Sequence, residues 1–141
     1  TIASEGKFYS PTGAGLMGFV DVRDIAAVAA LALTQPGHQG KTYTLTGPVA
    51  FNHAQVAEKI SAAIGKPVAF VDITADQFKA GALQHGLSDW LADALNELYA
   101  IVRAGYTGLV TDHIAKVTGR APRNLDDFIR EHAAVFQKGT A

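Results

Sequence analysis

The segment from Phe19 to Leu33, FVDVRDIAAVAALAL, constrains the fold of this chain more than any other. From Ile25 onward it contains no polar residue, so a helix here is apolar on every side. Such a helix is usually buried over most of its surface. The segment is shorter than the about 20 apolar residues that a membrane span requires. We therefore expect a helix inside a protein core, covered by a sheet on one side and by another layer on the other.

The start of this helix is specified by two acidic residues. Asp21 can accept a backbone hydrogen bond as the N-cap, and Asp24 then falls at the third helical position. A carboxylate there is stabilised by the positive end of the helix. We therefore interpret both acids as helix-start residues rather than catalytic ones, and expect the helix to end near Thr34, before Pro36.

Four short segments are typical of β-strands because of their apolar, aromatic or β-branched residues. A helix lying between two strands suggests a parallel sheet covered by helices. The predicted strands are Gly6–Ser10, Leu16–Val20, Lys41–Thr46 and Pro67–Ile73.

Further helices are predicted from capping residues and from apolar spacing. Asn52 with Gln55, and Thr74 with Gln77, form the pattern of a capping box. Ser88 precedes the longest helix, whose apolar stripe we interpret as core. The stripe consists of Leu91, Leu95, Leu98 and Val102. A short helix should begin at Thr111 or Asp112 and stop at Gly119, and a last helix capped by Asn124 should bury Phe128, Ile129, Ala133 and Phe136.

The glycine-rich segment Pro11–Gly15 is interpreted as a flexible connector. A phosphate-binding loop would have to open a helix, whose first N–H groups bind the anion. This segment precedes a predicted strand instead. The sequence therefore predicts no cofactor-binding residue here.

No group of residues has the spacing of a catalytic or metal site. The chain contains no Cys and its five histidines are too far apart in sequence to form a ligand pair on one helix. We expect these histidines, including His53 and His113, to be solvated or to cap helices. The net charge of −1 gives no electrostatic reason to expect nucleic acid or an anionic membrane as a partner. We assign no catalytic residue.

Several segments together resemble the C-terminal half of the NmrA-like proteins, atypical members of the short-chain dehydrogenase/reductase superfamily. The segment VDVRDIAAVAA is similar to the late V-D-V-x-D-I-A segment of that family. The similarity continues through KTYTLTGP (41–48), AEKISAAIGKPVAFVDIT (57–74) and GLSDWLADALNELYAIVRAGYTGLVTDHIAKVTGRAPRNLDDFI (86–129), in family order. The N-terminal nucleotide-binding half of the family has no counterpart in this chain.

This resemblance implies an α/β fold. Residues 1–50 would form the tail of a doubly wound Rossmann-type sheet, and residues 51–141 an α-rich substrate-side cap with one or two strands. The parent protein would bind NAD(P)(H), whereas we expect no cofactor to bind this chain alone. Its partners would be the missing N-terminal half or a second copy of the chain, and we expect a cytoplasmic protein that exposes apolar surface when isolated and can form a homodimer.

The resemblance also points to residues that would line the substrate cleft beside the nicotinamide: Phe8, Tyr9, Met17 and Tyr106. Apolar and aromatic walls would suit a flat, quinone-like or carbonyl substrate. The competing interpretation is that these four are ordinary core residues.

Three hypotheses for function remain open from the sequence. The chain can be the substrate-side portion of an NAD(P)-dependent quinone or carbonyl reductase, inactive alone. It can instead belong to a non-catalytic dinucleotide sensor that acts by protein contacts. A free-standing α/β domain that packs or self-associates is the third.

Overall fold

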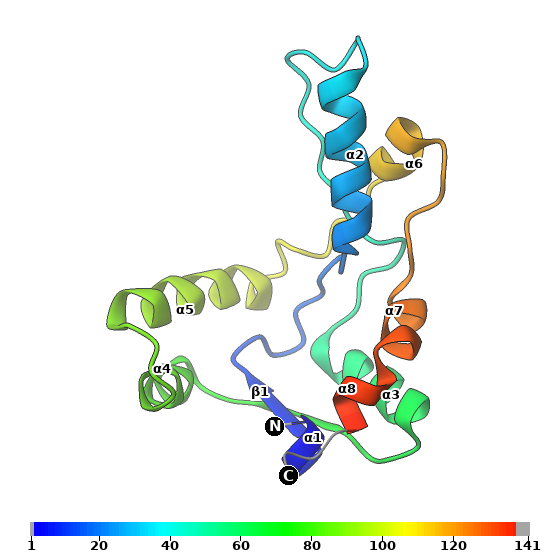
Figure 1. The fold of residues 1–141 in the computed structure, drawn as a ribbon. Helices are drawn as coiled ribbons and strands as arrows, with labels where there is room; N and C mark the ends of the chain where they lie inside the picture. Colours follow the sequence, from blue (N-terminus) through cyan, green and yellow to red (C-terminus); the bar gives the residue numbers. More distant parts are fainter. Residues whose placement is uncertain (1, 138–141) are drawn as a thin grey trace.

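The computed structural model describes residues 2–137 and shows a mixed α/β chain, as expected from the sequence (Figure 1). Helix far exceeds strand in it. Its elements, in chain order, are α1 (Ile2–Glu5), β1 (Lys7–Ser10), α2 (Val22–Thr34), α3 (His53–Ile64), β2 (Ala69–Asp72), α4 (Ala75–Gln84), α5 (Asp89–Arg103), α6 (His113–Thr118), α7 (Leu125–Glu131) and α8 (Ala133–Gln137).

The sheet of the described residues has two parallel strands. β1 pairs with β2 in the register Lys7 to Ala69 and Ser10 to Asp72. Both strands lie inside segments that the sequence predicts as strands. The sheet therefore joins one strand from residues 1–50 to one from residues 51–141, while the division at residue 50 stays a prediction.

The main core lies where α3 packs against α7, α8 and β2 (Figure 1). It is built from the apolar side of α3 and from Ile129 of α7, with partly buried residues such as Phe8 and Phe51 around it. The buried members are Val56, Ile60, Ile64 and Ile129. We call this part of the molecule the body.

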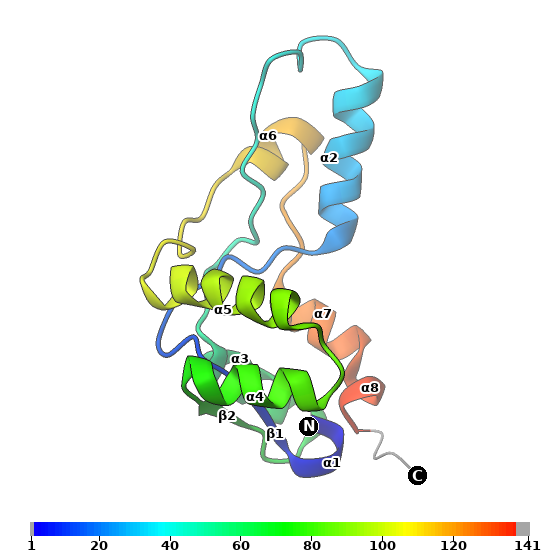
Figure 2. The same cartoon turned by 90° about the vertical axis from the view of Figure 1, so that its left-hand side faces the viewer.

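The second region is an arm in which α2 stands away from the body and contacts α6 (Figures 1 and 2). The prediction that α2 is buried on most sides is wrong for this structure. Only Asp24 and Val28 of the helix are buried, and Leu33 is 87% exposed. The physical reason is that α6 covers one side of α2, and no other described helix or strand packs extensively against the rest.

Two predicted strands, Leu16–Val20 and Lys41–Thr46, are not strands in residues 2–137. Met17 forms an isolated antiparallel bridge with Phe51. The segment around Thr44 is held instead by side chains near α6: the Thr44 N–H donates to His113 at 2.9 Å. A strand requires a neighbouring strand to complete its ladder, and neither segment has one within the described residues.

The capping predictions are confirmed. Asp21, Asn52, Thr74, Ser88 and Asn124 each accept a backbone N–H of their helix, and Gln55 and Gln77 complete two capping boxes. Asp112 precedes α6 without a side-chain cap bond.

Two helix predictions need correction. In α5, Leu91 and Leu98 are exposed rather than core, because α4 packs on a different side of the helix, where Phe78 meets Tyr99 with ring centroids 5.0 Å apart. The last helix is divided at His132 into α7 and α8. Of its predicted buried face, Phe128 is partly exposed.

Candidate functional site

A groove lies at the corner between the arm and α5, where three extended segments meet. We call it the corner groove and define it by Met17–Val20, Thr44–Thr46, Tyr106–Thr107 and Leu109, which enclose about 420 Å³. Binding sites for small molecules commonly have volumes of about 300 to 1,000 Å³ and apolar walls. The corner groove meets both descriptions.

Close backbone approach builds the floor of the corner groove. Gly18 donates its N–H to the Thr107 carbonyl oxygen at 3.2 Å. A Cβ at Gly18 would lie 3.0 Å from the Leu109 carbonyl oxygen, so a larger residue would push the two segments apart. The backbone approach at Gly47 is still closer, because a Cβ there would lie 2.0 Å from the Phe19 carbonyl oxygen. These glycines are required for contact between the segments.

One side chain and one backbone group of the loop that follows α5 hold the other two walls. The Thr107 hydroxyl donates to the Leu16 carbonyl oxygen at 2.6 Å. The Thr111 N–H donates to the Thr46 hydroxyl at 2.9 Å. The loop after α5 therefore positions both remaining segments.

The segment Pro11–Gly15 does not fit a dinucleotide phosphate. A Cβ on Gly15 would lie 2.1 Å from the Val102 carbonyl oxygen, so the protein itself fills the space beside this glycine. Arg103 donates through Nε to the Pro11 carbonyl oxygen at 2.8 Å and pairs with Asp72 at 2.6 Å. The segment is a connector, as predicted, but its contacts with α5 hold it in place, whereas the sequence predicted a flexible one. The Gly13 N–H donates to Asp72 and the Gly15 N–H to the Thr12 carbonyl oxygen, so neither is free for a pyrophosphate.

The structure brings together two of the four predicted substrate-lining residues. Met17 and Tyr106 both line the corner groove. Phe8 lies in the body against Phe70, with ring centroids 5.6 Å apart. Tyr9 is exposed and donates its hydroxyl to Glu5 at 3.0 Å, a bond that raises the pKa of the phenol. The role of all four residues in substrate binding stays a prediction.

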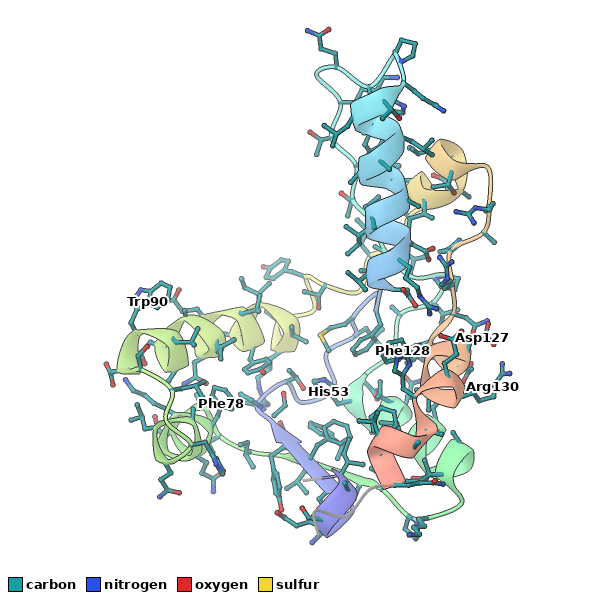
Figure 3. The ribbon with its side chains drawn as sticks, viewed as in Figure 1. His53, Phe78, Trp90, Asp127, Phe128 and Arg130 are labelled. Carbon is teal, nitrogen blue, oxygen red and sulfur yellow. The ribbon has the colours of Figure 1, made fainter. Side chains whose placement is uncertain are left out.

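His53 has a role that sequence reasoning missed. It is half-buried at the start of α3, facing β1 (Figure 3), with Phe8, Phe19 and Phe70 around its ring. Its Nδ1 lies 2.7 Å from the hydroxyl of the buried Thr12, which also accepts a bond from Ser10. Burial lowers the pKa of His53. The expectation of a solvated or capping histidine is wrong, since its partners lie far away in sequence.

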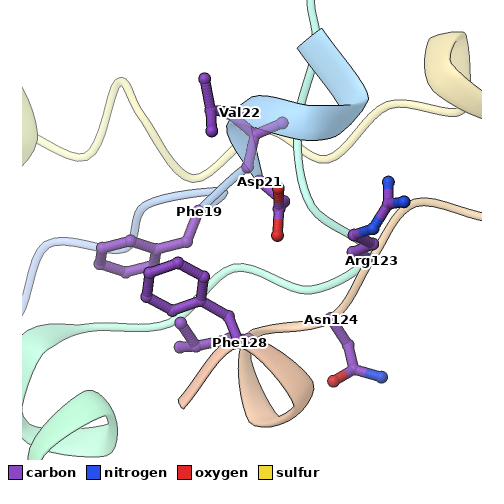
Figure 4. A pocket seen from close by; sticks show the side chains of 8 residues that line it. Phe19, Asp21, Val22, Arg123, Asn124 and Phe128 are labelled. Atoms are coloured by element: carbon purple, nitrogen blue, oxygen red, sulfur yellow. The ribbon is translucent and has the colours of Figure 1, made fainter. Parts of the chain in front are cut away.

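A second pocket, of about 340 Å³, lies between the start of α2 and the start of α7. Figure 4 shows the rings of Phe19 and Phe128 next to one another, with Asp21 directed into the same space. The polar groups of this pocket are already paired within the chain. Arg23 holds the Asp21 carboxylate and lowers its pKa to about 2, and Arg123 pairs with Asp24. The corner groove is therefore the better candidate for a ligand.

No protein-family model matches the chain. The NAD(P)H azoreductase of Xenophilus azovorans is 47% identical to it over 135 residues, which are 96% of this chain and 47% of the azoreductase. Quinone oxidoreductase 2 of Escherichia coli is 31% identical over 126 residues, covering 88% of this chain and 43% of that protein. The crystal structure of an NADPH-dependent quinone oxidoreductase from Escherichia coli superposes with a TM-score of 0.82 at 28% identity, covering 89% of this chain and 46% of that structure.

These matches agree in fold and in chemistry. The Escherichia coli quinone oxidoreductase also has a structure in complex with NADPH, to which this chain is similar with the same TM-score of 0.82. Among the described helices, none combines the length and the apolar character needed to cross a membrane. This chain spans about half the length of the curated relatives it matches, and over that half it is a homologue of NAD(P)H-dependent azo and quinone reductases.

Proposed function

We propose that this chain is the C-terminal, substrate-side portion of an NmrA-like NAD(P)H-dependent reductase whose acceptor is a quinone, azo or carbonyl compound. The observation that carries the proposal is the 47% identity to the NAD(P)H azoreductase of Xenophilus azovorans across 96% of this chain. In the proposed reductase the corner groove forms one wall of the acceptor site.

The chemistry of the corner groove supports this role. Met17, Phe19 and Leu109 supply apolar and aromatic walls, and these favour flat, weakly polar molecules. The cofactor would supply the hydride when bound to the rest of the protein. The residues of this chain would bind and orient the acceptor and exclude water.

A partner for the arm is the second part of the proposal. In the segment after α2, the Thr44 N–H donates to His113 at the start of α6, and the Thr44 carbonyl oxygen accepts from the Thr111 hydroxyl just before α6. The backbone groups of Tyr43 and Leu45, on either side of Thr44, have no hydrogen-bond partner among residues 2–137. Unpaired strand edges accept a further strand. We expect the nucleotide-binding part of the reductase, or else a second copy of this chain, to cover this edge and α2.

The sensor hypothesis has no observation in its favour. A dinucleotide sensor would also belong to a longer protein, but the relatives reported above are named for reduction of azo or quinone compounds. We therefore propose a catalytic parent protein.

A fusion protein tests the proposal. The part of the Xenophilus azovorans azoreductase that this chain does not match is joined ahead of this chain. We expect the fusion to oxidise NADPH when a naphthoquinone or an azo compound is present, and this chain alone to show no turnover. NADPH binding by the fusion without turnover of any acceptor would contradict the reductase proposal and favour the sensor.

The cofactor prediction is tested on this chain directly by calorimetric titration with NADPH and with NADH. We expect no heat of binding, since the Pro11–Gly15 segment is packed against α5. Tight binding would show that the chain carries a cofactor site of its own, and the start of α2 at Asp21 would then be the next region to examine.

A further inference from the structure

Helix α5 projects from the body together with α4, which is its main packing partner among the described helices and strands (Figure 1). The loop that follows α5 supplies Tyr106, Thr107 and Leu109 to the lining of the corner groove. A contact that fixes the end of α5 against the rest of the chain therefore also fixes the position of this wall.

Arg103, the last residue of α5, joins the helix to two other segments. Its Nε donates to the Pro11 carbonyl oxygen at 2.8 Å, and its Nη2 donates to Oδ1 of Asp72, at the end of β2, at 2.6 Å. The same Oδ1 accepts the Gly13 N–H at 2.9 Å. One guanidinium thus holds the connector, β2 and α5 together.

The shape of the guanidinium matters here more than its charge. An exposed ion pair by itself contributes little to stability. The planar fork of Arg103, however, binds a backbone carbonyl oxygen and a carboxylate at the same time, which the single ammonium group of lysine does not reproduce. The connector also lies close to this fork, because a Cβ on Gly13 would be 3.0 Å from Nη1 of Arg103.

The segments that Arg103 joins lead directly into the corner groove. Tyr106 comes three residues after Arg103, and Met17 comes two residues after the connector Pro11–Gly15. Both line the groove, whereas Arg103 is not one of its lining residues. The guanidinium is therefore placed to set the distance between two parts of the lining without facing the groove itself.

We infer that Arg103 is a positioning residue for the corner groove, and that it fixes Met17 and Tyr106 relative to one another through the connector and the end of α5. The inference rests on the proposed function for what the groove does. It goes beyond that function by naming a residue outside the groove on which the shape of the groove depends.

Met17 is the sole methionine of the chain, so an isotopically labelled methionine methyl group gives one NMR signal from the groove. Arg103→Lys keeps the charge but not the two bonds, and we expect it to shift and broaden this signal while the circular dichroism stays the same. Asp72→Asn keeps an oxygen acceptor and should shift the signal in the same direction by less. The control Arg130→Lys alters an exposed ion pair with Asp127 on α7 and should leave the signal unchanged.

A second readout separates positioning from a general contribution to stability. A displacement of about 1 Å at a site can cost about a hundredfold in rate. In the fusion protein, Arg103→Lys should therefore lower kcat/KM for a naphthoquinone at least about tenfold, through a higher KM for the quinone, and leave the KM for NADPH unchanged. Loss of folded protein alone would lower kcat and leave both KM values as they are.

A Met17 signal that is the same in the wild-type chain and in Arg103→Lys, or that moves equally in Arg130→Lys, would overturn the inference. Asp72→Asn decides the question if Arg103→Lys does not fold. An unchanged KM for the quinone in an active fusion would also overturn the inference and leave the proposed function standing. An inactive wild-type fusion would contradict the proposed function instead, and the Met17 signal of this chain would still decide whether Arg103 positions the groove.

Discussion

The helices α2 and α3 show how differently two apolar helices can be placed in one chain. Helix α2 is the more apolar, yet its described surroundings cover only one side, so that Leu33 is 87% exposed. Helix α3 carries lysine, glutamate and serine, yet four of its residues are buried. The difference is that α3 packs against α7, α8 and β2, whereas the main packing partner of α2 among the described elements is α6 alone.

The comparison teaches that apolar composition describes what a helix can bury and not what it does bury. Burial stabilises a helix only when another surface is present to exclude water. The body provides that surface for α3 within the chain. The arm lacks it for most of α2, which agrees with our prediction that the isolated chain exposes apolar surface.

The largest expected effect is in the body. Ile60 of α3 is 4% exposed and belongs to the main core. Ile60→Ala should lower the free energy of unfolding by about 3 to 4 kcal/mol, because it removes buried methylene groups and leaves a cavity. Urea unfolding followed by circular dichroism measures the change. A loss below about 1 kcal/mol would show that α3 is no better packed than α2.

The next effect concerns the ion pair that ties the arm to the body. The buried carboxylate of Asp24 accepts from the guanidinium and from the backbone N–H of Arg123. Asp24→Ala should lower the free energy of unfolding by about 2 to 3 kcal/mol, less than for a fully buried pair because Arg123 is partly exposed. The matched control is Asp126→Ala, which breaks the exposed pair with Lys59 and should cost less than about 1 kcal/mol. Equal losses for the two variants would contradict the structural role given to Asp24.

A smaller effect is expected from pH. Burial lowers the pKa of His53 below its ordinary 6.5, so the folded protein favours the neutral ring. The resulting stability is complete above the unfolded pKa and is lost as the pH falls from there through the folded pKa. The urea concentration at the unfolding midpoint should therefore decrease as the pH is lowered from about 7.5 to about 5.5. Asp21 stays ionised throughout this range, because its pKa is lowered to about 2.

Two variants isolate the contribution of His53. His53→Gln should reduce the dependence of the urea midpoint on pH in this range. His85→Gln changes an exposed histidine in the turn after α4 and should leave the dependence as it is. A midpoint that falls equally in the wild-type protein and in His53→Gln would show that burial of His53 does not couple folding to pH.

The smallest effect is expected at the exposed face of α2 when this chain is studied on its own. Leu33→Ala should change the free energy of unfolding of this chain by no more than about 0.5 kcal/mol, since the side chain is already in water. In the fusion protein the same substitution should cost about 1 to 2 kcal/mol more if the added part covers α2. Equal effects in both proteins would show that α2 remains uncovered, and the proposed partner surface would then be wrong.

Prediction from the sequence succeeds here wherever the interaction is local. The cap bonds of Asp21, Asn52 and Thr74 each span two or three residues, so the residues that decide them are adjacent in the sequence. The connector at Pro11–Gly15 was also predictable, because a phosphate loop must be followed directly by a helix, but its fixation by Arg103 was not, because that residue is 92 positions away. The mixed α/β content was predicted in part: two of the four predicted strand segments contain β1 and β2, whereas the two that flank α2 are not strands.

Prediction fails where the partner is distant. The bond between Thr12 and His53 joins residues 41 positions apart, and no sequence pattern near His53 predicts it. The sequence predicted only part of the corner groove. Met17 and Tyr106 were predicted to line a cleft, whereas Gly18, Thr44 and Leu109 were not predicted to line it. No local signal distinguishes those residues from others of their type.

The sequence by itself determined where helices begin, which segments can be extended, and the relationship to NAD(P)H-dependent reductases, because each of these depends on residue identity over short distances or on the order of motifs. The tertiary structure alone decided that Lys41–Thr46 is not a strand, that α2 is exposed and that His53 is half-buried. Hydrogen-bond pairing and burial depend on two surfaces that meet in the folded chain. The sequence of one segment does not identify the segment that will pack against it.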